Sequence, residues 1–206
     1  MDKKMLKESI SFMLVGVGGQ GTILASNVLA ELGLSLGYDV KQAEVHGMSQ
    51  RGGSVTSHVR WGEHVYSPII ARGDADILIA FEKSEVVRYV TDLKPGGLVL
   101  VNDYSIVPIT VSSGSAVYPT NEQINALLCK FTDRVYWVNG VNIAETVGNI
   151  RTANVAVLGG LASLMRMEAG LWLPIITKRV PPKSVEINRE AFIIGMQAIA
   201  HEKQPG

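Results

Sequence analysis

The sequence predicts an α/β fold, with an open and mostly parallel sheet, from three observations. An apolar run of strand length, residues 10–17, ends at a cluster of glycines. Apolar residues at helical spacing follow that cluster and end before Gly37, a typical helix stop. Residues 39–45 then have the pattern of a second strand. This order is typical of a parallel βαβ crossover, so we expect a Rossmann-like domain.

The middle of the chain adds strands and helices. Residues 54–61 alternate between apolar and polar side chains, which predicts a half-exposed strand. The turn at Gly62 is expected to join this strand to residues 64–67 in a β-hairpin insertion. Residues 106–118 are weakly patterned and predict a loop. Apolar runs and helical patterns predict strands at 77–81, 98–102 and 135–138 and helices at 82–93 and 120–131, the latter with a capping box of Thr120 and Gln123.

The C-terminal part of the chain is predicted to be helical, over residues 141–147, 152–167 and 182–201, with Pro174 opening a short helix between them. Residues 155–165 are apolar nearly all round, which indicates burial or contact with another subunit. No repeat or linker interrupts the pattern. The simplest account is a single domain over residues 1–206, with a core at about 10–165 and a helical C-terminal portion at 166–206.

Composition and charge narrow the function classes. Of 206 residues, 47% are apolar and 18% are charged, so the chain can build a core and is not intrinsically disordered. Nineteen basic residues balance nineteen acidic ones. Without a basic excess, a nucleic-acid partner is not expected. A net charge of zero leaves little repulsion between copies, so the isolated chain is a candidate homodimer.

Cysteine usage and the N-terminal region exclude further classes. Cys129 is the single cysteine, so the chain can form no intrachain disulfide and cannot by itself hold an iron–sulfur cluster or a multi-cysteine zinc site. We expect Cys129 to be a small buried hydrophobe within a helix. Residues 9–30 are uncharged but contain the glycine cluster, which argues against a signal peptide or membrane span. We therefore expect a cytoplasmic protein without a membrane partner.

The first candidate binding segment is Gly16-Val17-Gly18-Gly19-Gln20-Gly21. It matches G-x-G-x-x-G after a strand and before a helix, the context that this motif requires. Glycines allow the backbone to turn sharply, and the N–H groups at a helix start attract a phosphate. The candidate binding residues are Gly16, Gly18, Gly19, Gln20 and Gly21. In the alternative interpretation, the glycines only permit tight packing of strand against helix.

The second candidate segment follows the second strand, where ligands bind in open α/β sheets. It places an imidazole, a hydroxyl, an amide and a guanidinium within six residues, between glycines that permit close approach. Arg51 suits contact with a phosphate or carboxylate. A polar surface loop with turn glycines is the alternative. The candidate binding residues are His46, Gly47, Ser49, Gln50, Arg51, Gly52 and Gly53.

A free-standing NAD(P)-dependent oxidoreductase is a second hypothesis. A nicotinamide site needs an acid about 20 residues beyond the glycines, and Glu44 stands near that place. No partner set for hydride transfer accompanies it, and Glu44 also fits a solvated strand end. A third hypothesis is a non-catalytic nucleotide- or coenzyme-A-binding module.

Together, residues 16–21 and residues 44–55 resemble the gamma-type domain of the 2-oxoacid:ferredoxin oxidoreductases, and most resemble the beta subunit of the indolepyruvate ferredoxin oxidoreductases. The runs 67–76, 80–82, 95–97 and 101–102 are also similar, and the resemblance extends from about Phe12 to Leu164. It implies a subunit of an enzyme that oxidatively decarboxylates a 2-oxoacid, here expected to be indolepyruvate or a related aryl 2-oxoacid, forms an acyl-CoA and CO₂, and reduces ferredoxin.

The resemblance also implies how the work is divided. A large alpha subunit is expected to carry thiamine diphosphate, Mg²⁺ and the 4Fe-4S clusters, with ferredoxin as electron acceptor. The gamma-type domain is associated with coenzyme A binding and assembly. A thiamine-diphosphate site in this family has Gly-Asp-Gly followed by an asparagine-rich segment, whereas this chain has Gly73-Asp74-Ala75 with no asparagine pair at the right distance downstream. We expect no catalytic residue, metal ligand or tightly bound cofactor in this chain, and an inactive isolated chain.

Overall fold

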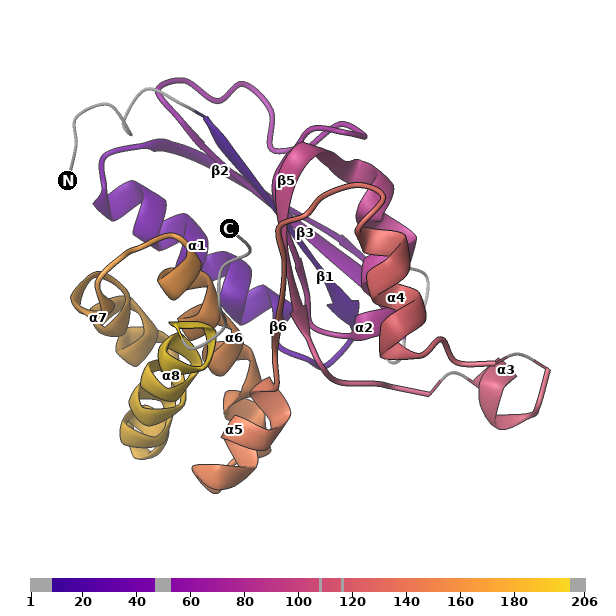
Figure 1. Ribbon diagram of the computed structural model, residues 1–206. Coiled ribbons are helices and arrows are strands. Elements are labelled where there is room, and N and C mark those ends of the chain that lie inside the picture. The colour runs from indigo at the N-terminus through magenta and orange to yellow at the C-terminus, as the bar shows by residue number, and fades with distance from the viewer. Residues whose placement is uncertain (1–8, 47–52, 108, 116, 201–206) are drawn as a thin grey trace.

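The computed structural model describes residues 9–46, 53–107, 109–115 and 117–200. Its described part is a three-layer α/β/α arrangement in which helices cover both faces of a six-stranded sheet (Figure 1). The predicted α/β class is confirmed. The strands are β1 (Ile10–Val17), β2 (Asp39–His46), β3 (Ser54–Gly62), β4 (Ala75–Ala80), β5 (Leu93–Asn102) and β6 (Val135–Val138).

The strand order is β2-β3-β1-β4-β5-β6. The pairs β1–β4, β4–β5 and β5–β6 are parallel, so the sheet is mostly parallel as predicted. The expected simple βαβ unit is corrected by the pairing of β3, which lies between β1 and β2 and runs antiparallel to both. The crossover from β1 to β2 therefore spans an inserted strand.

The hairpin is also placed differently from the prediction. β3 pairs with β2, whereas residues 64–67 form no strand. Both edges of β3 are already occupied by β1 and β2, so no edge remains for residues 64–67. Residues 64–70 instead run back along β3, where Val65 N donates to Asp39 Oδ2 at 2.8 Å and Ile70 N donates to His58 Nδ1 at 3.2 Å. The prediction that residues 54–61 form a half-exposed strand was also wrong. Residues 64–70 cover one side of β3 and α1 (Thr22–Ser35) covers the other.

The helices divide between the two sheet faces (Figure 1). Helix α1 and the C-terminal helices cover one face, while α2 and α4 cover the other. Residues 106–118, predicted as a loop, contain the short helix α3. The remaining helices are α2 (Lys83–Tyr89), α3 (Ile109–Ser112), α4 (Asn121–Leu128), α5 (Gly140–Thr146), α6 (Ala153–Leu164), α7 (Ala169–Arg179) and α8 (Val185–Ala200), with 3-10 turns at Val90–Asp92, Ile150–Thr152 and Pro182–Ser184.

Local signals placed most helix boundaries correctly. The capping box at the start of α4 is present, since Thr120 accepts from Gln123 N and the Gln123 side chain accepts from Thr120 N. Pro174 was expected to open a helix but lies inside α7, which begins at Ala169. Burial of Trp172 and its neighbours outweighs the hydrogen bond that the proline loses. Cys129 is exposed at the end of α4, so its predicted burial was wrong.

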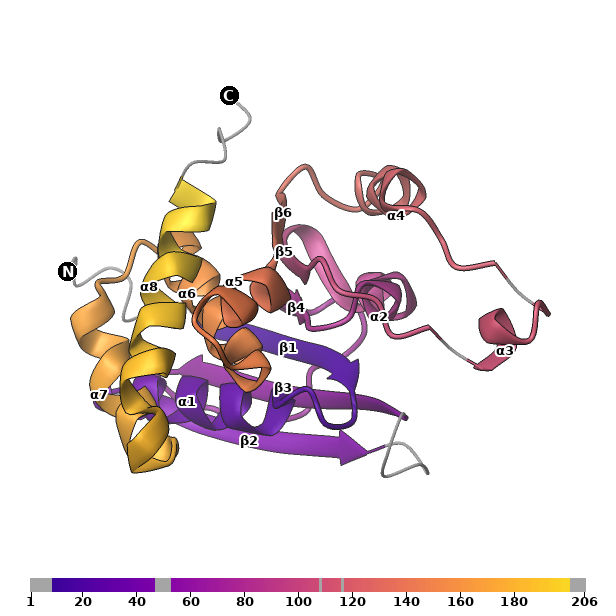
Figure 2. The same cartoon turned by 90° about the horizontal axis from the view of Figure 1, so that it is seen from below.

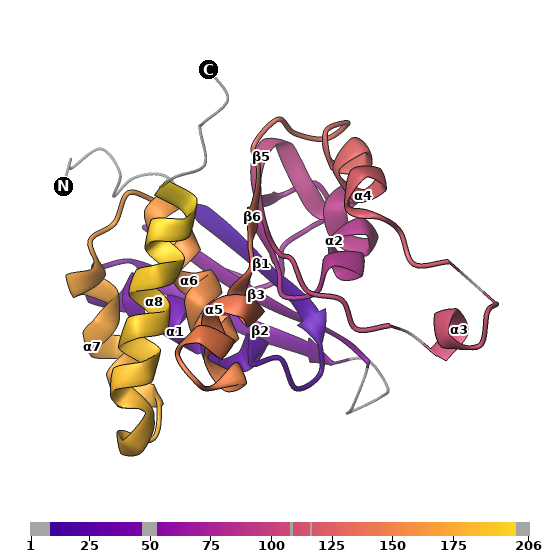
Figure 3. The ribbon, with the colours of Figure 1, turned by 60° about the horizontal axis from the view of Figure 1, so that its bottom comes forward.

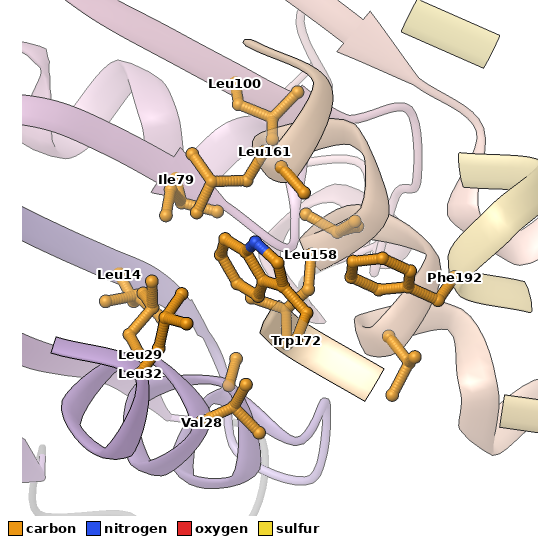
Figure 4. Close-up of a cluster of buried hydrophobic side chains, with 14 of the residues drawn as sticks. Leu14, Val28, Leu29, Leu32, Ile79, Leu100, Leu158, Leu161, Trp172 and Phe192 are labelled. Carbon is orange, nitrogen blue, oxygen red and sulfur yellow. The ribbon is translucent and has the colours of Figure 1, made fainter. Parts of the chain in front are cut away.

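The larger core lies between the sheet and the C-terminal helices (Figure 4). Trp172 of α7 fills its centre, fully buried among side chains from α1, the sheet, α6 and α8. Its ring lies 5.8 Å from that of Phe192. The predicted burial of residues 155–165 is confirmed over Val155–Ala162, because α6 lies between the sheet and α8. No helix in the described ranges is long and apolar enough to cross a membrane.

Candidate functional site

A cleft of about 650 Å³ lies at the carboxyl edge of the parallel strands, where the first candidate segment is found. Figure 2 shows β1 and β2 ending on the same side of the sheet. The volume is in the range of small-molecule sites. The residues that line the cleft are Gly18, Gly19, Gln20, Gly21, Leu24, Phe81, Asn102, Tyr104, Ile106, Val141, Ile150, Arg151, Ala153 and Asn154.

The glycine turn directs the start of α1 toward this cleft. Gly19 and Gly21 have φ values of 102° and 77°, which side chains rarely permit. The first intrahelical bond runs from Ala25 N to Gly21 O at 3.1 Å. The N–H groups of residues 22–24 precede that bond and therefore have no partner in the helix ladder. The turn thus presents the positive end of a fourteen-residue helix beside the cleft.

Gln20 holds the turn together by its side chain. Its Oε1 accepts from Val17 N at 2.7 Å, and its Nε2 donates to Phe81 O at 2.9 Å. The amide therefore ties the ends of β1 and β4. Gly16 does not line the cleft, because it lies beneath this side chain, and a Cβ there would be 2.8 Å from Gln20 Oε1. Both residues were candidate ligand contacts, and the geometry gives both a structural task.

Two asparagines continue this framework. Asn102, at the end of β5, donates to Phe81 O at 3.1 Å and accepts from Gly140 N at 2.9 Å. Asn154, in the first turn of α6, donates to Gly21 O at 3.2 Å. A Cβ on Gly21 would lie 2.2 Å from Asn154 Nδ2, so a larger residue at this position would displace the Asn154 side chain. The side chains of Asn102 from β5 and Asn154 from α6 thereby fix the floor of the cleft, with the backbone N–H of Gly140 in α5 as a further donor.

The second candidate segment meets the first at the same edge. Gly18 N donates to Gly53 O at 3.0 Å, although the two residues are far apart in the sequence. His46 ends β2 and pairs in register with Val55. Gly47, Ser49, Gln50, Arg51 and Gly52 lie outside the described residues. The structure therefore brings Gly53, the last residue of the second segment, beside the glycine turn, whereas His46 lies on β2, with β3 between it and β1.

Most of the residues that line the rest of the cleft were not identified from the sequence. Leu24 of α1, Val141 of α5 and Ile150 give the cleft an apolar surface, and Arg151 adds an exposed cation. Arg151, Ala153 and Asn154, at and just before the start of α6, also line the cleft. The positions of Phe81 and Asn102 could have been found from the sequence, because Phe81 directly follows the buried strand β4 and Asn102 ends the buried strand β5, and both strands have their carboxyl ends at this edge.

The rest of the wall comes from Tyr104 and Ile106. Lys83 N donates to Tyr104 O at 3.0 Å, and a buried acid holds Ile106 in place. Glu82 is fully buried, and its Oε2 accepts from Ser84 N and Glu85 N. Its Oε1 accepts from Ile106 N at 3.1 Å and from the Tyr118 hydroxyl. Burial, and secondarily the bond to Glu82, raises the pKa of Tyr118. These neutral donors satisfy the carboxylate, so Glu82 is an anchor of the wall.

The nicotinamide hypothesis loses its geometric support. Glu44 lies on β2, which β3 separates from β1, and Glu44 does not line the cleft. In a dinucleotide-binding domain, the acid belongs to the strand beside the glycine turn. Within the described ranges, no group of three or more His, Cys, Asp or Glu residues is placed to hold a metal ion.

Comparisons with known proteins identify the family. The model of the pyruvate ferredoxin/flavodoxin oxidoreductase family matches residues 11–198. The indolepyruvate oxidoreductase subunit IorB of Pyrococcus horikoshii is 39% identical over 191 residues, which are 91% of this chain and 95% of the relative. The gamma subunit of a keto/oxoacid ferredoxin oxidoreductase from Geobacter sulfurreducens superposes with a TM-score of 0.68 at 26% identity, over 93% of this chain and 98% of that one.

A third comparison concerns the fold alone. The 2-oxoglutarate:ferredoxin oxidoreductase of Magnetococcus marinus, solved with 2-oxoglutarate, coenzyme A and succinyl-CoA bound, gives a TM-score of 0.71 at 17% identity. The match covers 97% of this chain and 32% of that one. The glycine turn, the mixed sheet and the matches together show that this chain belongs to the pyruvate ferredoxin/flavodoxin oxidoreductase family and is a subunit of a 2-oxoacid:ferredoxin oxidoreductase.

Proposed function

We propose that this chain is the coenzyme-A-binding and assembly subunit of an indolepyruvate-type oxidoreductase. The complex converts an aryl 2-oxoacid, coenzyme A and oxidised ferredoxin into an acyl-CoA, CO₂ and reduced ferredoxin. The observation that carries the proposal is the cleft of about 650 Å³, which joins a helix N-terminus to an arginine and an apolar wall. The name of the Pyrococcus horikoshii relative supports the choice of indolepyruvate.

The residues of the cleft fit the chemistry of coenzyme A. Its phosphates need backbone N–H donors and a cation, which the start of α1 and Arg151 provide. Its adenine and pantetheine parts need apolar and uncharged surfaces, which Leu24, Val141 and Ile150 provide. The presence of coenzyme A in the Magnetococcus marinus enzyme supports the same ligand class. This chain would bind and orient the coenzyme and exclude water around it.

The other reaction groups belong, in this proposal, to a large alpha subunit. Thiamine diphosphate with Mg²⁺ decarboxylates the 2-oxoacid there, and 4Fe-4S clusters carry the electrons to ferredoxin. The single cysteine of this chain leaves cluster binding to a partner. The isolated chain should therefore be inactive, and it can form a homodimer through the surface meant for its partner.

Reconstitution tests the division of labour. The chain is used as anaerobic bait in its native lysate, and the recovered complex is assayed with indolepyruvate, coenzyme A and ferredoxin. We expect a large thiamine-diphosphate and iron–sulfur subunit, activity in the complex and none in the chain alone. Turnover by the purified chain, or recovery of no such subunit, contradicts the proposal. Tight binding of NAD(P)H instead of coenzyme A would revive the nicotinamide hypothesis.

Arg151→Ala tests the ligand site directly. Loss of a charge-assisted contact should weaken coenzyme A binding by about 1.5–3 kcal/mol, or roughly 10-fold to 150-fold, in an isothermal titration of the chain or complex. Arg134→Ala is the matched control, since Arg134 is also exposed but precedes β6, at the opposite edge of the sheet. Equal affinities for the wild type and Arg151→Ala would remove Arg151 from the site.

Arg51 gives a second arm of the same titration. It lies outside the described residues, and its candidate role comes from the sequence segment that meets the glycine turn at Gly53. Arg51→Ala should reduce coenzyme A affinity or complex turnover and leave the unfolding midpoint of the chain unchanged. Unaltered affinity and turnover would count against the second candidate segment as a binding element.

A further inference from the structure

One segment of the chain stands clear of the body of the molecule. Figures 1, 2 and 3 show that the chain leaves the sheet after β5, reaches outward to α3 and returns to α4. We name residues 104–119 the arm; positions 108 and 116 within it lie outside the described residues. Val107 is 53% exposed and Val117 is 90% exposed. The arm therefore offers apolar side chains to its surroundings.

The composition of the arm is unusual for a projecting segment. Its sequence, YSIVPITVSSGSAVYP, contains no Lys, Arg, Asp or Glu, although 18% of the whole chain is charged. A solvated projection normally carries charge, whereas the central parts of protein–protein interfaces are depleted of charged residues. Exposed valines on an uncharged projection thus have the composition of a surface that another protein covers.

The arm is fastened firmly where it joins the body. Glu82 accepts from Ile106 N near the start of the arm and from the Tyr118 hydroxyl near its end. Beside it, Lys83 Nζ bonds to Asn121 Oδ1 at 2.8 Å and to Asp103 Oδ1 at 3.3 Å. Both ends of the arm are thereby held to the start of α2, which lowers the ordering cost of a docking contact.

The place of attachment indicates which protein the arm meets. Tyr104 and Ile106, at the start of the arm, form part of the cleft wall. If the cleft binds coenzyme A, the subunit that makes the acyl group must approach the cleft mouth to deliver that group to the thiol. We propose that the arm is a docking element for the large, thiamine-diphosphate-carrying subunit; this proposal rests on the proposed function. A second copy of this chain has no such need to lie at the cleft.

Charge placed on the arm tests this proposal. The purified large subunit is titrated with the chain, and its indolepyruvate oxidation is measured against chain concentration at saturating coenzyme A. Val117→Asp should raise the half-saturating concentration about tenfold or more, and Val107→Asp should act in the same direction. Tyr66→Asp is the control, because Tyr66 is 94% exposed and lies on the segment that runs back along β3, away from the arm.

Each result has a defined meaning. The arm variants should retain the unfolding midpoint and the coenzyme A affinity of the isolated wild-type chain, because Val117 neither supports the core nor lines the cleft. If the arm variants have the same half-saturating concentration as the wild type, or if Tyr66→Asp raises it equally, the arm proposal alone is overturned. A wild-type chain that does not activate the large subunit at all overturns the proposed function as well. If the arm variants weaken self-association of the chain but activate the large subunit normally, the arm belongs to a homodimer interface, and the arm proposal is again overturned.

Discussion

At the scale of the residue, Gly21 joins the turn to the rest of the fold. Its left-handed φ of 77° forms the N-cap of α1, and its carbonyl accepts from Asn154 at 3.2 Å. Asn154 comes from α6, on the other wall of the cleft. Glycine is therefore favoured at position 21 for two reasons: it permits the left-handed φ, and it leaves room for the Asn154 side chain. The G-x-G-x-x-G pattern indicates only the first reason.

Gly21→Ala separates these two reasons. A left-handed alanine costs about 1–2 kcal/mol, and the clash with Asn154 must add to it. Gly37→Ala is the matched control, because Gly37 has a φ of 87° and open space around its Cβ position. Urea unfolding should show the larger loss for Gly21→Ala, and only that variant should weaken coenzyme A binding. Equal losses in both variants would mean that Asn154 yields without cost.

At the scale of the element, α6 and α8 cross with almost no space between their backbones. A Cβ on Gly159 would lie 2.1 Å from Phe192 O, and one on Gly195 would lie 2.0 Å from Ala156 O. Glycine normally weakens a helix by about 1 kcal/mol relative to alanine. Here the close approach lets α8 cover a helix that is apolar nearly all round, so burial offsets the weaker propensity.

Gly159→Ala should therefore lower the free energy of unfolding by about 1–3 kcal/mol, despite the better helix propensity of alanine, because the helices must separate. Gly170→Ala, in α7, has nothing within 4 Å of its Cβ position and should be neutral or stabilising by up to about 1 kcal/mol. Urea unfolding monitored by circular dichroism measures both. The opposite ranking would show that α6 and α8 reposition freely.

At the scale of the whole molecule, buried His58 links stability to pH. It lies on β3, is 7% exposed, and its Nδ1 accepts from Ile70 N, which requires a neutral ring. Burial lowers the pKa of His58, and the negative charge of nearby Asp92 partly opposes this shift. Burial raises the pKa of Asp92, and the positive charges of Arg72 and His58 partly oppose that shift. At any pH between the folded pKa of His58 and about 6.5, this imidazole is therefore protonated more in the unfolded chain than in the folded one.

The His58 contribution to stability should be fully present above about pH 6.5 and be lost as pH falls through its folded pKa, by at most about 1.4 kcal/mol per pH unit. Asp92 acts with the opposite sign, losing stability as pH rises above about 4. Urea unfolding at pH 7.5 and 5.5 checks this, with a smaller difference expected in His58→Gln. An equal difference in both proteins would assign the pH dependence to other groups.

Part of the site was predictable from local signals. The glycine pattern after an apolar strand indicated the start of α1, because a helix start depends on neighbouring residues. Anion binding at that helix start stays a prediction. The partners of that turn were not predictable. Asn154 is 133 residues from Gly21 and Phe81 is 61 residues from Gln20, and nothing in one sequence says which amide reaches which carbonyl.

The sequence by itself indicated all six strands of the sheet, although it added a strand at 64–67 that is absent, and it indicated most helices, the capping box at Thr120 and the family, since each depends on local periodicity or a short motif. Only the tertiary structure decided that β3 lies between β1 and β2, that residues 64–70 run back along β3, and that Cys129 is exposed. The physical reason is that the hydrophobic pattern along a strand identifies its buried faces but not its neighbours. Strand order and the cleft depend on competition among distant segments for the same sheet edges.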